Sequence, residues 1–372
     1  MINSEQQKRL IDTIGLLSVP GVGRGRLNKL IQTFGSAKAV RTASIQALSS
    51  VKGISRSMAG TIKEKFDENK AAEIARRVDL LDWTALFPGD EEYPEVLAEI
   101  TSAPPLLFRS GLAAKPEDRM IAIVGTRHPS EGGRMFAHNL AKHLASDGIV
   151  VVSGMADGID TAAHAGALAA GGRTVAVWGS SLDYVYPPTN KRLAKDIAVS
   201  GCIYSEYFPG TRPDRAFFPE RNRIISGLSN GVVVIEAGHK SGALITATHA
   251  IDQNREVFAV PGFPGVNTCV GSNELIKKGA SLVTSVEDIY RELPALHGDV
   301  VTRKFKRLPD MTDVERRIVD LFTGDPMQID QISRAVELPI DELTQLLLAL
   351  ELKGVIRELS GKRFILDEDF SC

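Results

Sequence analysis

Between residues 120 and 280 the chain alternates short apolar runs with glycine-rich turns, and this alternation restricts its fold more than any other feature. The runs are rich in β-branched residues, and helix-like stretches separate them. Such runs are typical of buried parallel strands in βα units. The sequence therefore predicts an α/β domain with a Rossmann-like open, mostly parallel sheet. Its strands are expected at residues 120–124, 149–152, 174–177, 232–235 and 257–260.

The turns that follow these runs are suited to binding an anion. In an open parallel sheet, ligands bind outside the carboxyl ends of the strands. Small turn residues let a ligand approach the backbone, and helix N-termini offer unpaired N–H groups. After the first strand, Gly125, Thr126 and Arg127 place a hydroxyl and a guanidinium at this edge, and arginine suits bidentate recognition of phosphate. The carboxyl edge of the sheet is therefore the predicted binding site.

Two later segments add polar groups to the same edge. Arg221, Asn222 and Arg223 lead into a helix, where two arginines beside an amide suit an anionic backbone. The same residues equally fit a salt-bridge network with Glu206 or Glu220.

The segment with Lys240, Ser241 and Gly242 opens another helix. Ser241 is expected to cap that helix, and the small residues behind it would still expose amides to a phosphate. The two roles are compatible, and Lys240 adds a positive charge.

The turn after the second strand is interpreted in mainly structural terms. Asp160 is expected to be the N-cap of the following helix, and Asp157 a turn former. Gly154 and Gly158 are expected to let a ligand approach closely. His164, a single helical histidine, is expected to be a packed or capping residue rather than a catalyst.

The chain lacks the common signatures of catalysis and cofactor binding. G-x-G-x-x-G does not follow the first strand, and no acidic residue ends the second, so a nicotinamide dinucleotide lacks both of its usual anchors. The Walker motif G-x-x-x-x-G-K-[ST] is also missing. No catalytic triad, metal cluster or pair of catalytic carboxylates stands out. We therefore expect a binding protein that uses no cofactor and no metal.

Three domains and a linker are predicted around this sheet. They are a helical helix-hairpin-helix-like (SAM-like) domain at 1–78, the Rossmann-like domain at 79–296, a linker at 297–310 and a winged helix at 311–372. In the Rossmann-like domain, two short strands are expected to flank a helix near residues 95–100 before the main sheet begins.

The first helical hairpin could grip a nucleic-acid phosphate with its amides and the following helix N-terminus. It presents Gly21 and Gly23 with Arg24 and Arg26 beside them. A second copy carries Ser55 where the second glycine belongs, which favours a purely structural role. Packing or protein contact is the alternative for the whole module.

Charge is distributed unevenly along the chain. Residues 1–80 hold 14 Lys and Arg against 7 Asp and Glu, whereas residues 310–372 hold 7 against 14. A basic front end suits a polyanionic partner, although it also fits an ordinary solvated surface. The expected recognition helix of the winged helix has no Lys or Arg, so we interpret that domain as a protein contact or regulatory element. The basic run at 303–307 is interpreted as a solvated tether.

Cysteine usage and hydropathy indicate a cytoplasmic protein. Cys202, Cys269 and Cys372 lie far apart and form no C-x-x-C pair, which suggests a reducing compartment. No apolar run approaches the roughly 20 residues of a membrane span, and no membrane partner is expected.

Taken in order, the motifs resemble those of the DNA-processing protein A family (DprA, also called Smf). The matching motifs include IVGTRHPS, VVSGMADGIDTAAHAGAL, VAVWGSSLDYVYPPTN, FFPERNRIISGLS and GVVVIEAGHKSGALITATHA. The resemblance implies a non-enzymatic homodimer that binds single-stranded DNA. It also implies that the protein loads the RecA recombinase onto that DNA, and displaces single-strand-binding protein, during natural transformation of competent cells. Carried over by motif, the DNA pocket would comprise Gly125, Thr126, Arg127, Ser153, Gly154, Gly158, Arg221, Asn222, Arg223, Lys240, Ser241 and Gly242, with Phe217 and Phe218 able to stack on bases.

Two other functions remain open from the sequence. The sheet edge also resembles that of the lonely-guy nucleotide phosphoribohydrolases, which carry P-G-G-x-G-T-x-x-E where this chain has EAGHKSGALITA. The closing glutamate of that motif is missing, and Glu236 precedes the turn instead, which disfavours hydrolysis. A sensor of a small nucleotide is the third possibility.

Overall fold

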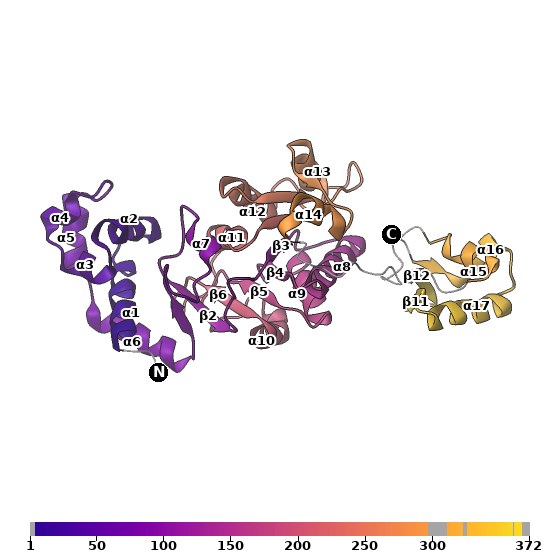
Figure 1. Cartoon of the computed structure of the whole chain (residues 1–372), viewed down its shortest axis with the longest axis horizontal. Helices are drawn as coiled ribbons and strands as arrows, with labels where there is room; N and C mark the ends of the chain where they lie inside the picture. The colour runs from indigo at the N-terminus through magenta and orange to yellow at the C-terminus, as the bar shows by residue number, and fades with distance from the viewer. Residues whose placement is uncertain (1–3, 297–310, 323–325, 360, 367–372) are drawn as a thin grey trace. The chain divides into compact units, whose positions relative to one another are not determined.

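The computed structural model describes residues 4–296, 311–322, 326–359 and 361–366. These residues form two compact units, one on each side of residues 297–310 (Figure 1). The predicted linker and its basic run lie outside the described residues.

A nine-stranded sheet forms the centre of the first unit, in the order β1-β2-β6-β5-β4-β3-β7-β8-β9. Pairing is parallel from β6 through to β9, and β1 and β2 add an antiparallel extension next to β6. The predicted Rossmann-like, mostly parallel sheet is therefore confirmed. The strands are β1 (Thr84–Leu86), β2 (Leu107–Gly111), β3 (Met120–Val124), β4 (Val150–Ser153), β5 (Thr174–Val177), β6 (Cys202–Ser205), β7 (Gly231–Val234), β8 (Glu256–Ala259) and β9 (Ser281–Leu282).

The five strands expected from the apolar runs all form, within one residue of their predicted bounds. The two short strands expected around residues 95–100 also form, as β1 and β2, with helix α7 (Glu95–Ala98) between them. Two strands of this sheet were not among those expected. β6 reads Cys-Ile-Tyr-Ser and β9 is two residues long, so neither presents a β-branched run.

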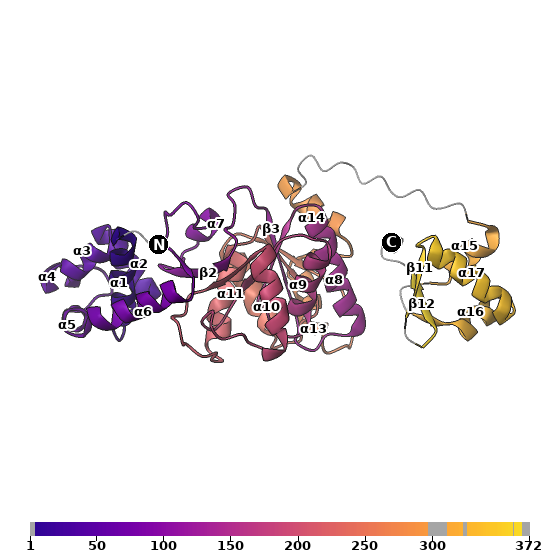
Figure 2. The same ribbon diagram turned by 90° about the horizontal axis from the view of Figure 1, so that it is seen from below.

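Helices cover both faces of the sheet, as burial of both faces of a parallel sheet requires. On one face, alternate strand residues such as Ala122 and Val232 pack against α7, α11 and α12. On the other face, residues such as Ile121 and Val151 pack against α8, α9 and α14, and Figure 2 shows α8, α9 and α10 side by side. The helices are α8 (Glu131–Ser146), α9 (Ile159–Ala169), α10 (Lys191–Ser200), α11 (Phe217–Gly227), α12 (Gly242–Asp252), α13 (Val270–Lys277) and α14 (Val286–Glu292).

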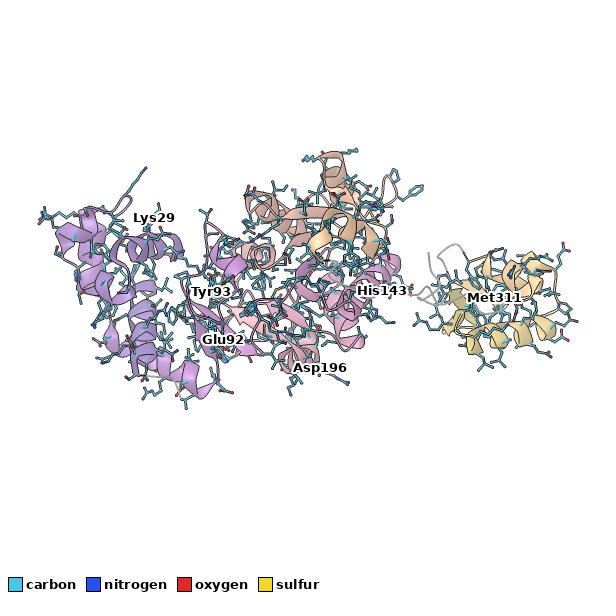
Figure 3. The ribbon with its side chains drawn as sticks, in the orientation of Figure 1. Lys29, Glu92, Tyr93, His143, Asp196 and Met311 are labelled. Atoms are coloured by element: carbon cyan, nitrogen blue, oxygen red, sulfur yellow. The ribbon has the colours of Figure 1, made fainter. Side chains whose placement is uncertain are left out.

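Side chains fill the space between these layers (Figure 3). Tyr93, which the figure labels, is buried, and its hydroxyl donates a hydrogen bond to the Pro104 carbonyl at 2.9 Å. Burial raises the pKa of this phenol. Tyr93 therefore remains neutral and ties the segment before β2 to the core.

Helices α8 and α9 approach closely because Gly166 has no side chain. A Cβ at this position would collide with the backbone carbonyl of His138 on α8. We expect Gly166→Ala to lower the free energy of unfolding by about 1–3 kcal/mol through overpacking. Gly60→Ala is the control, because nothing lies near that Cβ and alanine favours a helix by up to about 1 kcal/mol. Denaturant titration measures both, and equal stability of the two variants would contradict the packing argument.

Six helices precede the sheet: α1 (Ser4–Leu17), α2 (Arg24–Phe34), α3 (Ala37–Thr42), α4 (Ile45–Ser49), α5 (Arg56–Lys65) and α6 (Glu68–Leu80). They share a core of their own, which includes Leu27, Leu30 and Leu48. A second cluster joins α1 and α6 to the sheet through residues such as Ile14 and Phe108. The helical module and the sheet thus belong to one compact unit.

The second unit has the order of a winged helix. It contains α15 (Asp313–Val319), β10 (Met327–Gln328), α16 (Ile329–Val336), α17 (Ile340–Leu352), β11 (Ile356–Leu359) and β12 (Arg363–Leu366). The helix in the recognition position, α17, has no basic residue, and its apolar residues Ile340, Leu348 and Leu352 are exposed. The predicted winged helix is confirmed.

Among the described residues, no helix is long and apolar enough to cross a membrane. Cys202 and Cys269 are both buried free thiols.

Candidate nucleic-acid interface

The carboxyl ends of β3, β4, β5 and β7 converge on one edge of the first unit. Strand order reverses around β3, since β4 lies on one side of it and β7 on the other. A reversal of this kind opens a crevice at the carboxyl ends, where open α/β sheets bind ligands. Arg127 lies in the turn directly after β3, and its side chain is exposed at this crevice.

A narrow pocket at this edge collects residues from the turns after β3, β4 and β5 and from helix α11. The guanidinium of Arg127 lies over the ring of Phe218, 5.6 Å from its centroid. The ring of Tyr186 lies beside Phe218 with the centroids 5.6 Å apart, and 41% of Tyr186 is exposed. The pocket thus combines a cation with two aromatic faces. Its lining is Arg127, Gly154, Ala156, Asp157, Tyr186, Pro187, Phe218 and Arg221.

Arg221 forms the floor of this pocket rather than its surface. The residue is 5% exposed, and its Nη1 donates hydrogen bonds to the carbonyl of Gly154, at 2.6 Å, and to that of Val177. Burial lowers the pKa of the guanidinium to about 10, although the carboxylate of Asp160 opposes that effect. Arg221 therefore ties the carboxyl ends of β4 and β5 together.

Asp160 is not the N-cap of α9, contrary to the prediction. Gly158 occupies the N-cap position with φ of 85°, which an L side chain rarely adopts. Asp160 lies within the first turn, where it is buried and accepts a hydrogen bond from the Ala156 amide at 3.2 Å. Burial raises the pKa of Asp160, and Arg221 opposes that rise.

At three positions of the edge, internal packing leaves no room for a side chain and so requires glycine. A Cβ on Gly154 would lie 2.7 Å from Arg221 Nη2, and one on Gly158 would lie 2.5 Å from the Thr126 carbonyl. A Cβ on Gly125 would lie 2.6 Å from Ile159. Internal packing therefore accounts for Gly154 and Gly158 without the close approach of a ligand that was expected there.

Asn222 and Arg223 make internal contacts as well. Arg223 Nη2 forms a 2.6 Å ion pair with Glu206, so the predicted salt-bridge alternative is present. The Asn222 amide donates to the Gly242 carbonyl at 3.1 Å and links α11 to the start of α12. Both residues are at most 8% exposed.

Other predicted residues differ in how far they reach the surface. Ser153 is fully buried, and its hydroxyl donates to the Ile123 carbonyl at 2.7 Å. Phe217 is half-buried and stacks on Tyr207 with the centroids 4.3 Å apart. Lys240 and Gly242 are exposed, and the Ser241 side chain caps α12 by accepting from the Ala243 amide, as predicted.

His164 is packed, as expected. It is fully buried, its Nδ1 lies 2.7 Å from the Thr174 hydroxyl, and burial lowers its pKa to about 3. Glu236 is also engaged internally, because its carboxylate accepts hydrogen bonds from the amide and the hydroxyl of Ser130.

The first helical hairpin faces the sheet domain. Arg24 forms ion pairs with Glu206 at 3.1 Å and with Glu220 at 2.9 Å. Burial alone would lower the pKa of Arg24, but the neighbouring carboxylates raise it overall. Arg26 is exposed and donates to the Gly21 carbonyl at 2.6 Å, which closes the hairpin.

The two hairpins end differently at the following helix. Gly23 is the N-cap of α2 and provides no side-chain cap, whereas the Ser55 side chain caps α5 by accepting from the Met58 amide. The second hairpin is therefore self-capped, in agreement with the structural role predicted for it. In the first hairpin, no side chain at the N-cap accepts a hydrogen bond from the N–H groups in the first turn of α2.

Sequence reasoning missed Tyr186 as part of the site. It lies in the loop after β5, within the segment SSLDYVYPPTN, at no helical or strand spacing. An aromatic residue in a turn at the carboxyl edge was the only available signal.

Comparison with known families matches all three segments of the chain. Residues 84–294 match the family described as DNA recombination-mediator protein A, and residues 306–362 match the DprA winged helix domain. Residues 14–68 match a SAM-like helix-hairpin-helix tandem.

Individual relatives agree with these matches. The protein Smf of Synechocystis sp. is 34% identical over 399 residues, which cover 98% of this chain and 99% of that protein. The crystal structure of DNA processing protein A from Streptococcus pneumoniae is 34% identical with a TM-score of 0.67, over 76% of this chain and 97% of that one.

A third relative is the DNA processing protein A of Helicobacter pylori, whose structure is described for its unique single-stranded DNA binding mode. It is 30% identical with a TM-score of 0.51, over 57% of this chain and 96% of that one. With a family model matching more than half of the chain and a relative aligned over nearly its whole length, the chain belongs to the DNA-processing protein A (DprA/Smf) family.

Proposed function

We propose that the protein binds single-stranded DNA at the carboxyl edge of its sheet. The observation that carries this proposal is the arrangement of exposed Arg127 over Phe218 beside Tyr186. A cation next to aromatic faces is how proteins hold single strands without reading sequence, since the cation contacts the phosphate and the rings stack on bases. The single-stranded DNA binding mode described for the Helicobacter pylori relative supports the proposal.

Within this site the exposed residues are assigned to direct contact and the buried ones to support. Arg127, Thr126, Phe218, Lys240, Ser241 and Gly242 reach the surface at least in part and are proposed to contact the strand. Ser153, Gly154, Arg221, Asn222 and Arg223 hold these contacts in place from beneath. Gly125, Gly158 and Phe217 shape the turns and the aromatic wall.

The biological role proposed is that of a recombination mediator in the cytoplasm. The protein would protect incoming single strands, load RecA onto them and help displace single-strand-binding protein during natural transformation. It would act as a homodimer and without catalysis. Family membership is the support for these finer steps.

A fluorescence polarisation titration with labelled single-stranded and duplex oligonucleotides at two salt concentrations tests the proposal. We expect tight, salt-sensitive binding that prefers the single strand, because phosphate contacts release counterions and stacking needs unpaired bases. Equal affinity for duplex and single strand, or binding insensitive to salt, would contradict it. Saturable binding of a mononucleotide alone would instead favour a nucleotide sensor.

The winged helix is expected to be dispensable for DNA binding. Truncation after Leu308 removes an excess of acidic residues, so single-strand affinity should stay within a factor of about three. The exposed apolar residues of α17 fit contact with a protein better than contact with DNA. A large loss of affinity in a truncated protein that keeps its oligomeric state would show that this domain contacts DNA.

A further inference from the structure

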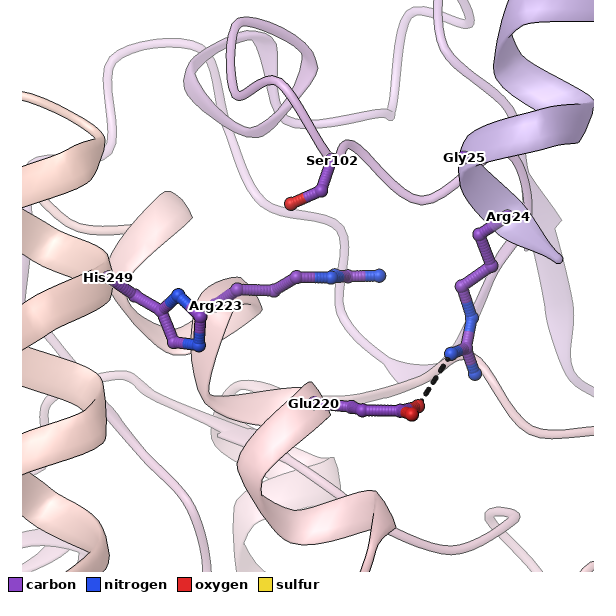
Figure 4. Close-up of a pocket in the computed structure, with 6 residues that line it drawn as sticks. All are labelled: Arg24, Gly25, Ser102, Glu220, Arg223 and His249. Atoms are coloured by element: carbon purple, nitrogen blue, oxygen red, sulfur yellow. Dashed lines mark hydrogen bonds and ion pairs between the residues drawn. The ribbon is translucent and has the colours of Figure 1, made fainter. Parts of the chain in front are cut away.

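A second cavity lies at the junction of the helical module and the sheet. It has a volume of about 300 Å³, within the range of small ligand sites (Figure 4). Its lining comes from both sides of the junction: Arg24, Gly25, Ser102, Glu220, Arg223 and His249. We call it the junction cavity.

The groups around this cavity are those that bind a phosphoryl group. Figure 4 shows the guanidinium of Arg223 extending between Ser102 and Glu220 toward Arg24. Arg223 is 8% exposed, and its Nη1 has no hydrogen-bond partner in the structure. Gly25 lies in the first turn of α2, where N–H groups lack intrahelical acceptors. An unpaired buried donor is costly, and an anion in the cavity would satisfy it.

Glu220 currently neutralises part of this positive charge. Arg24 forms ion pairs with the carboxylates of Glu206 and Glu220. The Glu206 side chain is 2% exposed, whereas that of Glu220 is 53% exposed. An exposed ion pair contributes little to stability, so an incoming phosphate could replace Glu220 on Arg24 while Glu206 stays in place. Without Glu220, Arg24 and Arg223 face only the Glu206 carboxylate, so positive charge predominates at the cavity.

Helix α11 is the common wall of the two pockets. Its residues Phe218 and Arg221 line the sheet-edge pocket, while Glu220 and Arg223 line the junction cavity. A strand that crosses the N-terminus of α11 would therefore reach both.

We propose that the junction cavity is a second phosphate subsite, which receives a backbone phosphate of a single strand that also occupies the sheet-edge pocket. This inference rests on the proposed DNA binding, and it assigns to the first helical hairpin a role shared with α11 rather than a separate clamp.

Position 25 offers a matched pair of variants for the test. Nothing lies within 4 Å of a Cβ at Gly25, so Gly25→Glu and Gly25→Gln should both fold, which thermal unfolding verifies. They differ only in the carboxylate placed at the cavity mouth. Binding is measured by polarisation with oligothymidylates of about 6 and about 20 nucleotides, the short one being sized for a single subsite.

We expect Gly25→Glu to bind the long oligonucleotide about five- to tenfold more weakly than Gly25→Gln, and the short one within about twofold, because only a long strand spans both subsites. Glu220→Gln should bind the long oligonucleotide about two- to fivefold more tightly, because it frees Arg24. Equal binding of the long oligonucleotide by the two variants at position 25 would overturn the proposal.

A calorimetric titration with deoxythymidine monophosphate separates the remaining outcomes. If the nucleotide binds the parent but not Gly25→Glu, while long DNA binds both equally, the phosphate comes from a free nucleotide and the strand path is wrong. If the parent binds neither oligonucleotide, the proposed DNA binding fails. In that case the nucleotide titration still decides whether the cavity takes phosphate, and no binding in either assay overturns the subsite.

Discussion

Arg127→Ala should weaken single-strand binding by about 1–3 kcal/mol, the range of a charge-assisted contact. The exposed guanidinium is held over Phe218, so alanine removes both the phosphate contact and the cation beside the stacking face. The loss should be the same for all base compositions, because phosphate contacts carry no sequence information. The slope of log affinity against log salt should fall by roughly 0.7, the value for one phosphate on a single strand.

Arg291→Ala is the control for this experiment. Arg291 is an exposed arginine of α14. Leu293, two residues later, lies against Gly231 at the amino end of β7, so Arg291 is remote from the carboxyl edge of the sheet. It should leave affinity and salt slope unchanged. If the folded Arg127→Ala protein binds as well as Arg291→Ala does, Arg127 does not contact DNA.

Arg221→Met should lower the free energy of unfolding by about 3–5 kcal/mol, the cost of leaving a buried charge without the opposite charge that compensates it. The substitution removes the donors to the carbonyls of Gly154 and Val177 and strands the Asp160 carboxylate. Adding Asp160→Asn should recover part of the loss, because it removes the stranded charge. Arg215→Met, at an exposed position just before α11, should change stability by no more than about 0.5 kcal/mol.

The loss of folding stability in Arg221→Met should also depend on pH. The folded-state pKa of Asp160 already lies above its usual 3.8 because of burial, and without Arg221 it rises further. A carboxyl group with a raised pKa binds more protons in the folded state, so stability falls as pH increases from 3.8 through the raised pKa. Denaturant titrations across this range check the prediction, and a loss that is constant with pH would exclude Asp160 as its cause.

Much of the fold could be predicted from local sequence, because a run of β-branched residues identifies a buried parallel strand. The strands β3 and β7 were predictable for that reason, and β6 was not, because Cys202 and Tyr204 break the pattern. The N-cap of α9 was misplaced because aspartate is a better cap than glycine in general, whereas here a positive φ at Gly158 decided the start.

The site was predictable only as a set of turns. Which arginines are free depends on partners far away in sequence: Arg24 and Glu220 are 196 positions apart, and neither the periodicity nor the motif around Arg24 indicates that pair. For Arg223 the sequence left two interpretations open, contact with an anion or a salt bridge, and the ion pair with Glu206 on the loop after β6 matches the second. Arg127 was correctly placed at the edge because the end of its own strand determines its position.

The internal bonds of Arg221 and Asn222 have a consequence for the rate of DNA exchange. They fix the turns before any strand arrives, so binding does not have to order a loop. Encounter with a strand should then be fast and governed by charge. Differences between variants at this edge should appear mainly as the lifetime of the complex, which a stopped-flow chase with unlabelled DNA measures directly.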